Sequence, residues 1–136
     1  MIGIDTNLLV RYITQDGDEA PAVTRYLETR CTFEHPGFVC LIVLCELVCV
    51  LARAYRYDRT AIAAILTKLL ATAEFEVERS MLAWRALQEY GEGTAGFSDY
   101  LIGEVVRECD ASPVHTLDRK AGKSPNFVLV ETRASR

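Results

Sequence analysis

The sequence has few of the residues that interrupt or cross-link a fold. Its 136 residues include only four prolines and eight glycines, and half of the chain is hydrophobic, which is typical of a globular domain rather than a disordered chain. The five cysteines form no CxxC pair and no zinc-like spacing with histidine. We therefore expect reduced thiols, with Cys40, Cys45 and Cys49 buried in an apolar segment, and a cytoplasmic location.

The chain also lacks a segment long enough to cross a membrane. Its longest apolar run, residues 38–52, is interrupted by Glu46 and is shorter than the roughly 20 residues that a membrane span needs. Met1 is not followed by the basic and hydrophobic segments of a signal peptide. The net charge of −4 argues against binding nucleic acid through bulk electrostatics, although carboxylates gathered around a cation would add to that negative count.

Short apolar segments alternate with helical patterns along the chain. The segments with strand length and β-branched content are Met1–Ile4, Phe38–Leu41, Phe75–Val77, Val114–Leu117 and Phe127–Val130. Apolar residues at helical spacing predict helices that begin near Pro21, Asp58, Ser80 and Ser98. Because parallel strands need crossover connections, we expect one α/β domain over residues 1–136, with three layers and a central parallel sheet of about five strands covered by helices on both faces.

Four acidic side chains follow strands or begin helices at the same predicted edge of the sheet. Asp5 comes directly after the first predicted strand, and Asp118 comes directly after the fourth. Asp99 lies in the first turn of the last predicted helix, and Glu46 lies in the first turns of the helix after the second strand. Because ligands of open parallel sheets bind outside the carboxyl ends of the strands, the pattern predicts that these four acids form one site.

Each of the four acids also has a purely structural explanation. Asp5 and Asp99 can stabilise a helix N-terminus, and Asp118 can be a solvated turn residue. Glu46 is the only ionisable residue in its apolar segment, so a buried position there would require a partner such as Arg53 or a bound cation. These explanations stay open for the single residues, and it is the four acids together that favour a site.

Carboxylates that lie close together raise one another's pKa values and destabilise a fold unless a cation is present. Hard oxygen ligands without histidine or cysteine select Mg²⁺ or Mn²⁺ over zinc. A divalent ion held in this way activates water and polarises a phosphoryl oxygen, which is the chemistry of metal-assisted phosphodiester hydrolysis.

The motifs that carry these acids resemble those of a known family. "IDTNLLVRYI", "LIVLCELVCVLARAY", "GFSDYLIGEV" and "VHTLDRKA" together resemble the PIN domain, and more narrowly the VapC-type toxins of bacterial toxin–antitoxin pairs. The resemblance implies a metal-dependent endoribonuclease in which Mg²⁺ or Mn²⁺ is coordinated by Asp5, Glu46, Asp99 and Asp118. It also implies a homodimer, inhibition by a cognate antitoxin, and supporting polar roles for Asn7 and Thr116. An apolar excess between residues 38 and 51 independently favours the dimer.

Basic and aromatic residues near the motifs are candidates for RNA contact. The candidates for phosphate contact are Arg11, Arg53, Arg119 and Lys120. A solvated or helix-pairing charge is the more ordinary role for each of them. Tyr12, Trp84 and Tyr100 can stack on bases, but packing in the core or at a dimer contact explains them better.

Two other functions fit part of the pattern. Phosphoryl-transfer enzymes of the haloacid-dehalogenase type also use an aspartate after the first strand, but they need a second aspartate two residues later, where this chain has Asn7. A PIN-like domain that binds RNA or a protein partner without cleavage is the other alternative. Metal-dependent cleavage of RNA separates these alternatives from a nuclease.

Overall fold

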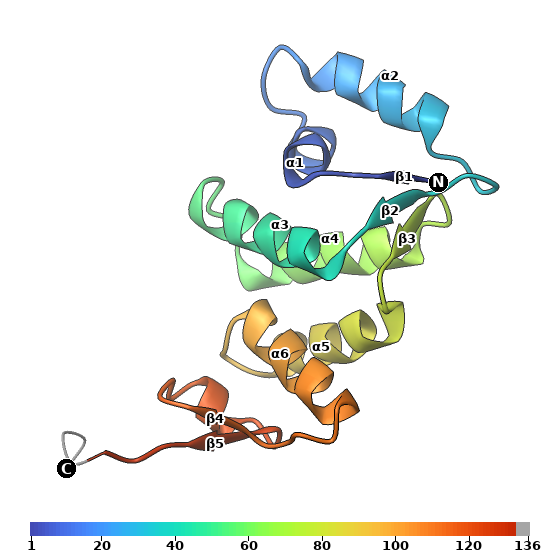
Figure 1. The fold of residues 1–136 in the computed structure, drawn as a ribbon. Helices are drawn as coiled ribbons and strands as arrows, with labels where there is room; N and C mark the ends of the chain where they lie inside the picture. Colours follow the sequence, from blue (N-terminus) through green and yellow to red (C-terminus); the bar gives the residue numbers. More distant parts are fainter. Residues whose placement is uncertain (133–136) are drawn as a thin grey trace. The chain divides into compact units, whose positions relative to one another are not determined.

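The structure is a computed structural model that describes residues 1–132, and it divides into two compact units. The first unit is Met1–Ser80, and the second begins at Met81. Figure 1 labels the helices and strands in chain order. The single domain expected over residues 1–136 stays a prediction, and residues 133–136 lie outside the described part of the chain.

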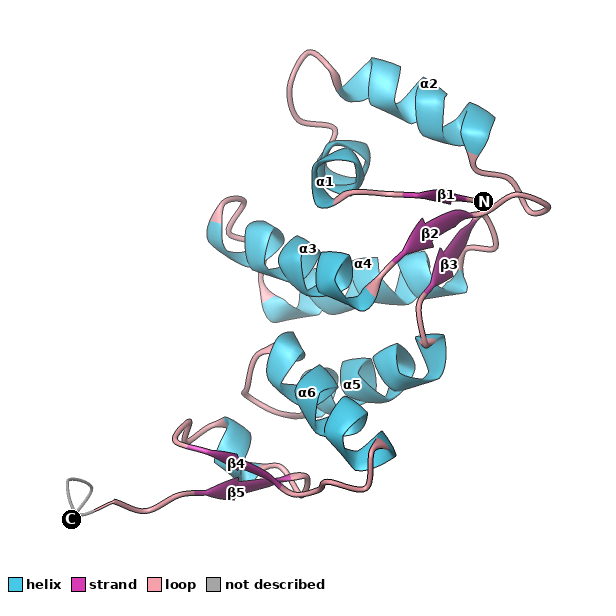
Figure 2. Cartoon of the chain, in the orientation of Figure 1, coloured by secondary structure: helices cyan, strands magenta, loops and turns pink. Residues whose placement is uncertain are grey.

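The first unit contains a three-stranded parallel sheet and four helices (Figure 2). The strands lie in the order β1 (Ile2–Gly3), β2 (Gly37–Val39) and β3 (Phe75–Val77). Gly3 pairs with Phe38, and Val39 pairs with Val77. The helices are α1 (Thr6–Thr14), α2 (Ala20–Arg30), α3 (Leu41–Arg53) and α4 (Arg59–Ala71). Helix α1 packs on α2 and α3, and α3 packs on α4.

Leucine side chains dominate the core of the first unit. On α3 the buried residues form one stripe along the helix: Val43, Leu44, Leu47, Val48 and Leu51. The side chains of Leu9 and Leu27 bring α1 and α2 into the same core, where both are fully buried. Although α3 is apolar over most of its sequence, it therefore has a single buried face.

The polar and sulfur-containing residues of α3 lie away from that buried face. Glu46 and Cys49 are exposed, and Cys45 is half-buried, as is Cys40 just before the helix. The prediction of buried thiols at these three positions is wrong, and so is the premise that Glu46 is buried. Both errors arose because an apolar sequence does not reveal which helix face packs inward. All five cysteines are free, as expected.

The second unit contains two helices and a two-stranded parallel sheet. After α5 (Ser80–Glu92), whose first residue ends the first unit, come α6 (Phe97–Glu108), β4 (Val114–Thr116), the short 3₁₀ helix η1 (Ala121–Lys123) and β5 (Phe127–Leu129). Val114 pairs with Phe127 across the β4–β5 ladder. Strand β4 contacts α6 and η1. Tyr90 and Phe97 pack edge to face, with ring centroids 6.0 Å apart, and both are buried.

Local capping sets where the helices begin. Asp58 accepts a hydrogen bond from the Ala61 backbone N–H at 2.8 Å, which confirms it as the cap of α4. Helix α6 begins at Phe97 rather than at Ser98, and its N-cap residue is Gly96. The Gly96 N–H donates to Asp99 Oδ2 at 3.2 Å, so the Asp99 carboxylate in the first turn holds the backbone of the residue that precedes the helix.

All five predicted strands form, but their ladders make two sheets of three and two strands rather than one sheet of about five. The alternation of strands and helices predicted the α/β class and the parallel pairing correctly. It could not indicate which strands exchange hydrogen bonds. Among residues 1–132 we find no helix with the length and apolar character of a membrane span.

Candidate functional site

A threonine joins the first two of the four acids. Thr6 is the first residue of α1, and its backbone N–H donates to Asp5 Oδ1 at 2.8 Å. Its hydroxyl donates to Glu46 Oε1 at 2.6 Å, across 40 residues of sequence. Thr6 therefore holds a carboxylate of α3 beside the carboxylate that follows β1. Sequence reasoning gave Thr6 no role, although it stands between Asp5 and Asn7 in "IDTN".

Asp5 and Glu46 line one pocket of about 620 Å³ in the first unit. Asn7 and Arg11, both on α1, also line it, together with Tyr55 in the segment after α3. Within residues 1–132 no ion pair joins Glu46 to Arg53, the partner that the sequence suggested. The partner of Glu46 is instead the Thr6 hydroxyl. Two carboxylates and a guanidinium in one open pocket suit a ligand that carries both a cation and an anion.

In the second unit, Asp99 and Asp118 each stabilise a local turn. Asp99 accepts from Gly96 at the start of α6. Asp118 Oδ1 accepts from the backbone N–H groups of Lys120 and Ala121 at 2.8 and 2.9 Å, and its own N–H donates to Thr116 Oγ1 at 3.0 Å. Thr116 is thus in direct contact with Asp118. The structural explanations of Asp99 and Asp118 therefore hold as local roles. In each carboxylate, a single oxygen accepts the hydrogen bonds described: Oδ2 in Asp99 and Oδ1 in Asp118.

The donor set of the first unit fits a hard divalent cation. Mg²⁺ takes one or two protein carboxylates directly and keeps several waters, and Asp5 with Glu46 offers two carboxylates already oriented by Thr6. Across the described residues, no three histidine, cysteine, aspartate or glutamate side chains are gathered closely enough to hold a metal ion. The structure therefore brings together one pair of the predicted ligands, Asp5 and Glu46.

The predicted RNA contacts lie in different surroundings. Arg11 lines the pocket of Asp5 and Glu46, while Arg53 is exposed at the end of α3, and Arg119 and Lys120 are exposed after β4. Among the aromatic candidates, Tyr100 is 5% exposed, and its hydroxyl accepts from the Ala95 N–H at 3.1 Å. Packing in the core, the favoured alternative, is the role of Tyr100.

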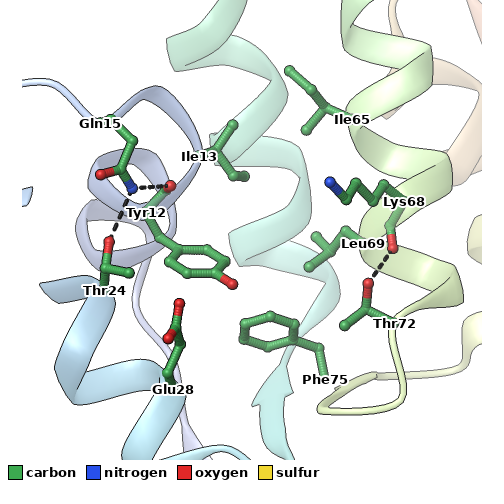
Figure 3. Close-up of a pocket in the computed structure, with 10 residues that line it drawn as sticks. All are labelled: Tyr12, Ile13, Gln15, Thr24, Glu28, Ile65, Lys68, Leu69, Thr72 and Phe75. Carbon is green, nitrogen blue, oxygen red and sulfur yellow. Dashed lines mark hydrogen bonds between the residues drawn. The ribbon is translucent and has the colours of Figure 1, made fainter. Parts of the chain in front are cut away.

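Tyr12 lines a second pocket of the first unit, of about 430 Å³ (Figure 3). Its ring packs edge to face against Phe75, with centroids 6.0 Å apart. Gln15 also lines this pocket, and it donates to the Tyr12 carbonyl at 2.7 Å and to the Thr24 hydroxyl at 2.9 Å. None of the four predicted acids lines this pocket.

Glu89 and Glu104 of the second unit have buried side-chain oxygens in surroundings that favour the protonated form of Glu89. The side-chain atoms Glu89 Oε1 on α5 and Glu104 Oε1 on α6 are buried and accept no hydrogen bond within the described chain. Glu104 Oε2 accepts from Asn126 Nδ2 at 3.1 Å. Burial raises the pKa of Glu89 to about 7, and the neighbouring Glu104 carboxylate adds to this rise, while Arg107 opposes it. Near neutral pH the protonated Glu89 can donate to Glu104.

We expect the stability of the chain to fall as the pH rises from 4.5 to 7. In this range the folded state retains a proton on Glu89 that the unfolded state releases. The stabilisation that this proton gives the folded state is therefore complete below pH 4.5 and lost above about pH 7. Because Glu89 is partly exposed, solvent screening limits the effect to on the order of 1 kcal/mol. Glu89→Gln should flatten this part of the profile, since an amide donates at any pH. Thermal melts of the wild type and of Glu89→Gln from pH 4.5 to 8 measure this pH dependence. Melting temperatures that change in parallel in the two proteins would contradict the retained proton on Glu89.

Comparison with known proteins places this arrangement in a family. A family model, described as the PIN domain, matches residues 2–124. None of the curated proteins matches the chain. The matched range covers all four predicted acids and both units as far as η1, and it ends before β5. The α/β arrangement of helices and short parallel strands agrees with this match.

Proposed function

The chain belongs to the PIN domain family, whose members have a nuclease-like fold and are typically metal-dependent nucleases, and we propose that it is an endoribonuclease that uses Mg²⁺ or Mn²⁺. The observation that carries the proposal is the bond from Thr6 to Glu46, which holds two acids from distant segments in one pocket. This arrangement goes beyond helix capping, because Glu46 lies within α3 and caps nothing.

The proposed ligands of the ion are the four acids of the sequence motifs: Asp5, Glu46, Asp99 and Asp118. When bound, the ion supplies Lewis-acid activation of water and of the scissile phosphate. The chain supplies the orientation of the carboxylates: Thr6 fixes Asp5 and Glu46, and Thr116 contacts the backbone of Asp118. Asn7 lines the pocket as a neutral supporting residue, and Arg11 offers a positive charge to the phosphate.

We further propose that the protein is the toxin of a type II toxin–antitoxin pair, that it acts in the cytoplasm, and that it forms a homodimer. The motif resemblance to VapC-type toxins supports the first point, and the free cysteines fit the second. The apolar excess between residues 38 and 51, of which Ile42 is 73% exposed, supports the homodimer. Sedimentation at high protein concentration tests the dimer, and a monomer there would contradict it.

The cleavage assay uses the purified chain and end-labelled single-stranded RNAs of mixed sequence. We expect internal cuts with Mg²⁺ or Mn²⁺ and none with EDTA, because the carboxylates cannot activate water alone. Binding of the same RNAs without cleavage in either metal would contradict the nuclease and favour a PIN-like domain that only binds RNA. No binding and no cleavage of any RNA would reject RNA as the substrate.

Replacing Thr6 with valine should weaken metal binding. Valine keeps the shape of the side chain but removes the hydroxyl that holds Glu46 Oε1. Loss of a residue that orients a metal ligand typically lowers affinity by about 10- to 100-fold. Calorimetric titration with Mn²⁺ measures the change, and Thr6→Ser, which keeps the hydroxyl, should bind nearly as the wild type does. Equal Mn²⁺ affinity of the valine variant and the wild type would show that Thr6 does not position the acids.

A further inference from the structure

The pocket of Asp5 and Glu46 extends to a linked pair of side chains, Arg11 and Tyr55. Both contact the same carboxylate oxygen. The Tyr55 hydroxyl donates to Asp16 Oδ2 at 2.8 Å, and Arg11 Nη1 lies 3.9 Å from that oxygen. Asp16, which follows α1, therefore connects the end of that helix to the segment after α3, across 39 residues of sequence.

The backbone around this linkage is also fixed. Gln15 adopts a left-handed conformation at the end of α1, and its N–H donates to the Arg11 carbonyl at 2.9 Å. Gly17, beside the Arg11 side chain, has φ of +86°, a backbone conformation that glycine adopts readily and other residues rarely adopt. On the other side, the Tyr55 N–H donates to the Val50 carbonyl at 3.3 Å.

Stability alone does not explain the linkage. The Arg11 and Asp16 side chains are 37% and 58% exposed, and exposed ion pairs stabilise a fold very little. The hydrogen bond to Asp16 restricts the Tyr55 side chain, and the longer ion pair restricts Arg11 more weakly. Ordering side chains in advance lowers the entropy cost of binding a ligand. The restricted pair lies in the pocket that holds two of the proposed metal ligands.

The chemistry of the pair matches one nucleotide of a single strand. A guanidinium binds phosphate oxygens with two parallel hydrogen bonds, and a tyrosine ring provides a face on which a base stacks. We propose that Arg11 and Tyr55 form a nucleotide subsite for single-stranded RNA beside Asp5 and Glu46, and that Asp16 is the positioning residue that holds both. This inference rests on the proposed ribonuclease function and names the residues that place the strand.

The test measures the affinity for a fluorescent single-stranded RNA by anisotropy, in EDTA so that no cleavage occurs. Tyr55→Leu should weaken binding by about tenfold or more, because it removes the stacking face. Tyr55→Phe keeps the ring and should lose less than about threefold. Asp16→Ala should weaken binding by about fivefold, and Asp16→Asn, which keeps an acceptor for the Tyr55 hydroxyl, should restore most of it.

Tyr26 provides the matched control. It is an exposed tyrosine on α2 whose hydroxyl accepts from Arg30 Nη1 at 3.0 Å, so it also lies beside an arginine, but it does not line the pocket of the acids. Tyr26→Leu should leave the RNA affinity within about twofold of the wild type. Melting temperatures of all variants near that of the wild type show that each remains folded.

The outcomes separate the subsite from the nuclease. Wild-type RNA affinity of Tyr55→Leu and Asp16→Ala overturns the subsite, even if metal-dependent cleavage is found. Equal losses for Tyr55→Leu and Tyr26→Leu also overturn it, because the effect would then not belong to the pocket. If Tyr55→Leu loses affinity while the wild type shows no cleavage in Mn²⁺, the subsite stands and the nuclease function fails. In an active protein, the variants should raise KM more than they lower kcat.

Discussion

Asp5→Asn should lower the rate of RNA cleavage by at least about a hundredfold while the protein remains folded. The substitution removes a negative charge from the pocket shared with Glu46. In the proposed metal site, a divalent ion would lose a ligand and part of its charge balance. The rate loss should be no smaller than that found when a supporting residue around a metal is removed. Single-turnover cleavage of a labelled RNA, with Mn²⁺ supplied, measures the rate.

The fold should tolerate this change because asparagine caps a helix as well as aspartate does. Its side-chain oxygen can still accept from the Thr6 N–H, the bond that starts α1. Without metal, removing one of two neighbouring negative charges should leave the melting temperature equal or higher. Asp110→Asn makes the same charge change at an exposed position after α6 and should cleave as the wild type does. A wild-type rate from Asp5→Asn would contradict the assignment of Asp5.

Gly93→Ala should reduce the free energy of unfolding by about 3 kcal/mol. A Cβ at Gly93 would collide with the Tyr100 hydroxyl and lie 2.9 Å from the Tyr100 ring carbon that bears it. Tyr100 cannot easily move, because its ring is buried and its hydroxyl accepts from the Ala95 N–H. Overpacking of a core typically costs about 1–3 kcal/mol, and a broken buried hydrogen bond adds a comparable penalty. Urea unfolding of both proteins measures the loss.

Gly91→Ala is the control for this substitution. Gly91 lies in α5, two residues before Gly93, and a Cβ there meets no atom within 4 Å. Alanine should therefore be neutral or slightly stabilising, since it favours the helix. In a Tyr100→Phe background, the penalty of Gly93→Ala should shrink, because the colliding hydroxyl is gone. If Gly93→Ala unfolds at the same urea concentration as the wild type, Tyr100 does not pack as described.

The local elements of the fold were largely predictable from the sequence because their signals are local. The Asp58 cap and the apolar spacing that follows it are both found in α4, and the five strands form within a residue or two of their predicted limits. The division of the strands into two sheets was not predictable, because hydrogen-bond partners depend on packing between distant segments. The buried face of α3 was hidden for a different reason: its sequence is apolar on nearly every side.

Two of the predicted acids, Asp5 and Glu46, line one pocket, whereas the residues that position them were not predictable from the sequence. A carboxylate directly after a strand, such as Asp5, stands out in a sequence because it interrupts an apolar pattern. The Thr6 hydroxyl and the Asp16 carboxylate act on partners 40 and 39 residues away, and a threonine or aspartate at a helix end has no distinctive spacing. Tyr55, in the segment "ARAYRY" at the end of α3, carries no signal of a pocket without the fold.

Titration of the full chain with Mn²⁺, monitored by calorimetry, tests the metal assignment most directly. We expect the wild type to bind the ion, and Asp5→Asn and Asp99→Asn each to abolish that binding, while Asp110→Asn binds as the wild type does. That pattern would show that metal binding depends on Asp5 and on Asp99. Unchanged Mn²⁺ affinity in Asp5→Asn and Asp99→Asn, or no binding by the wild type, would contradict the proposal that these carboxylates hold the catalytic metal.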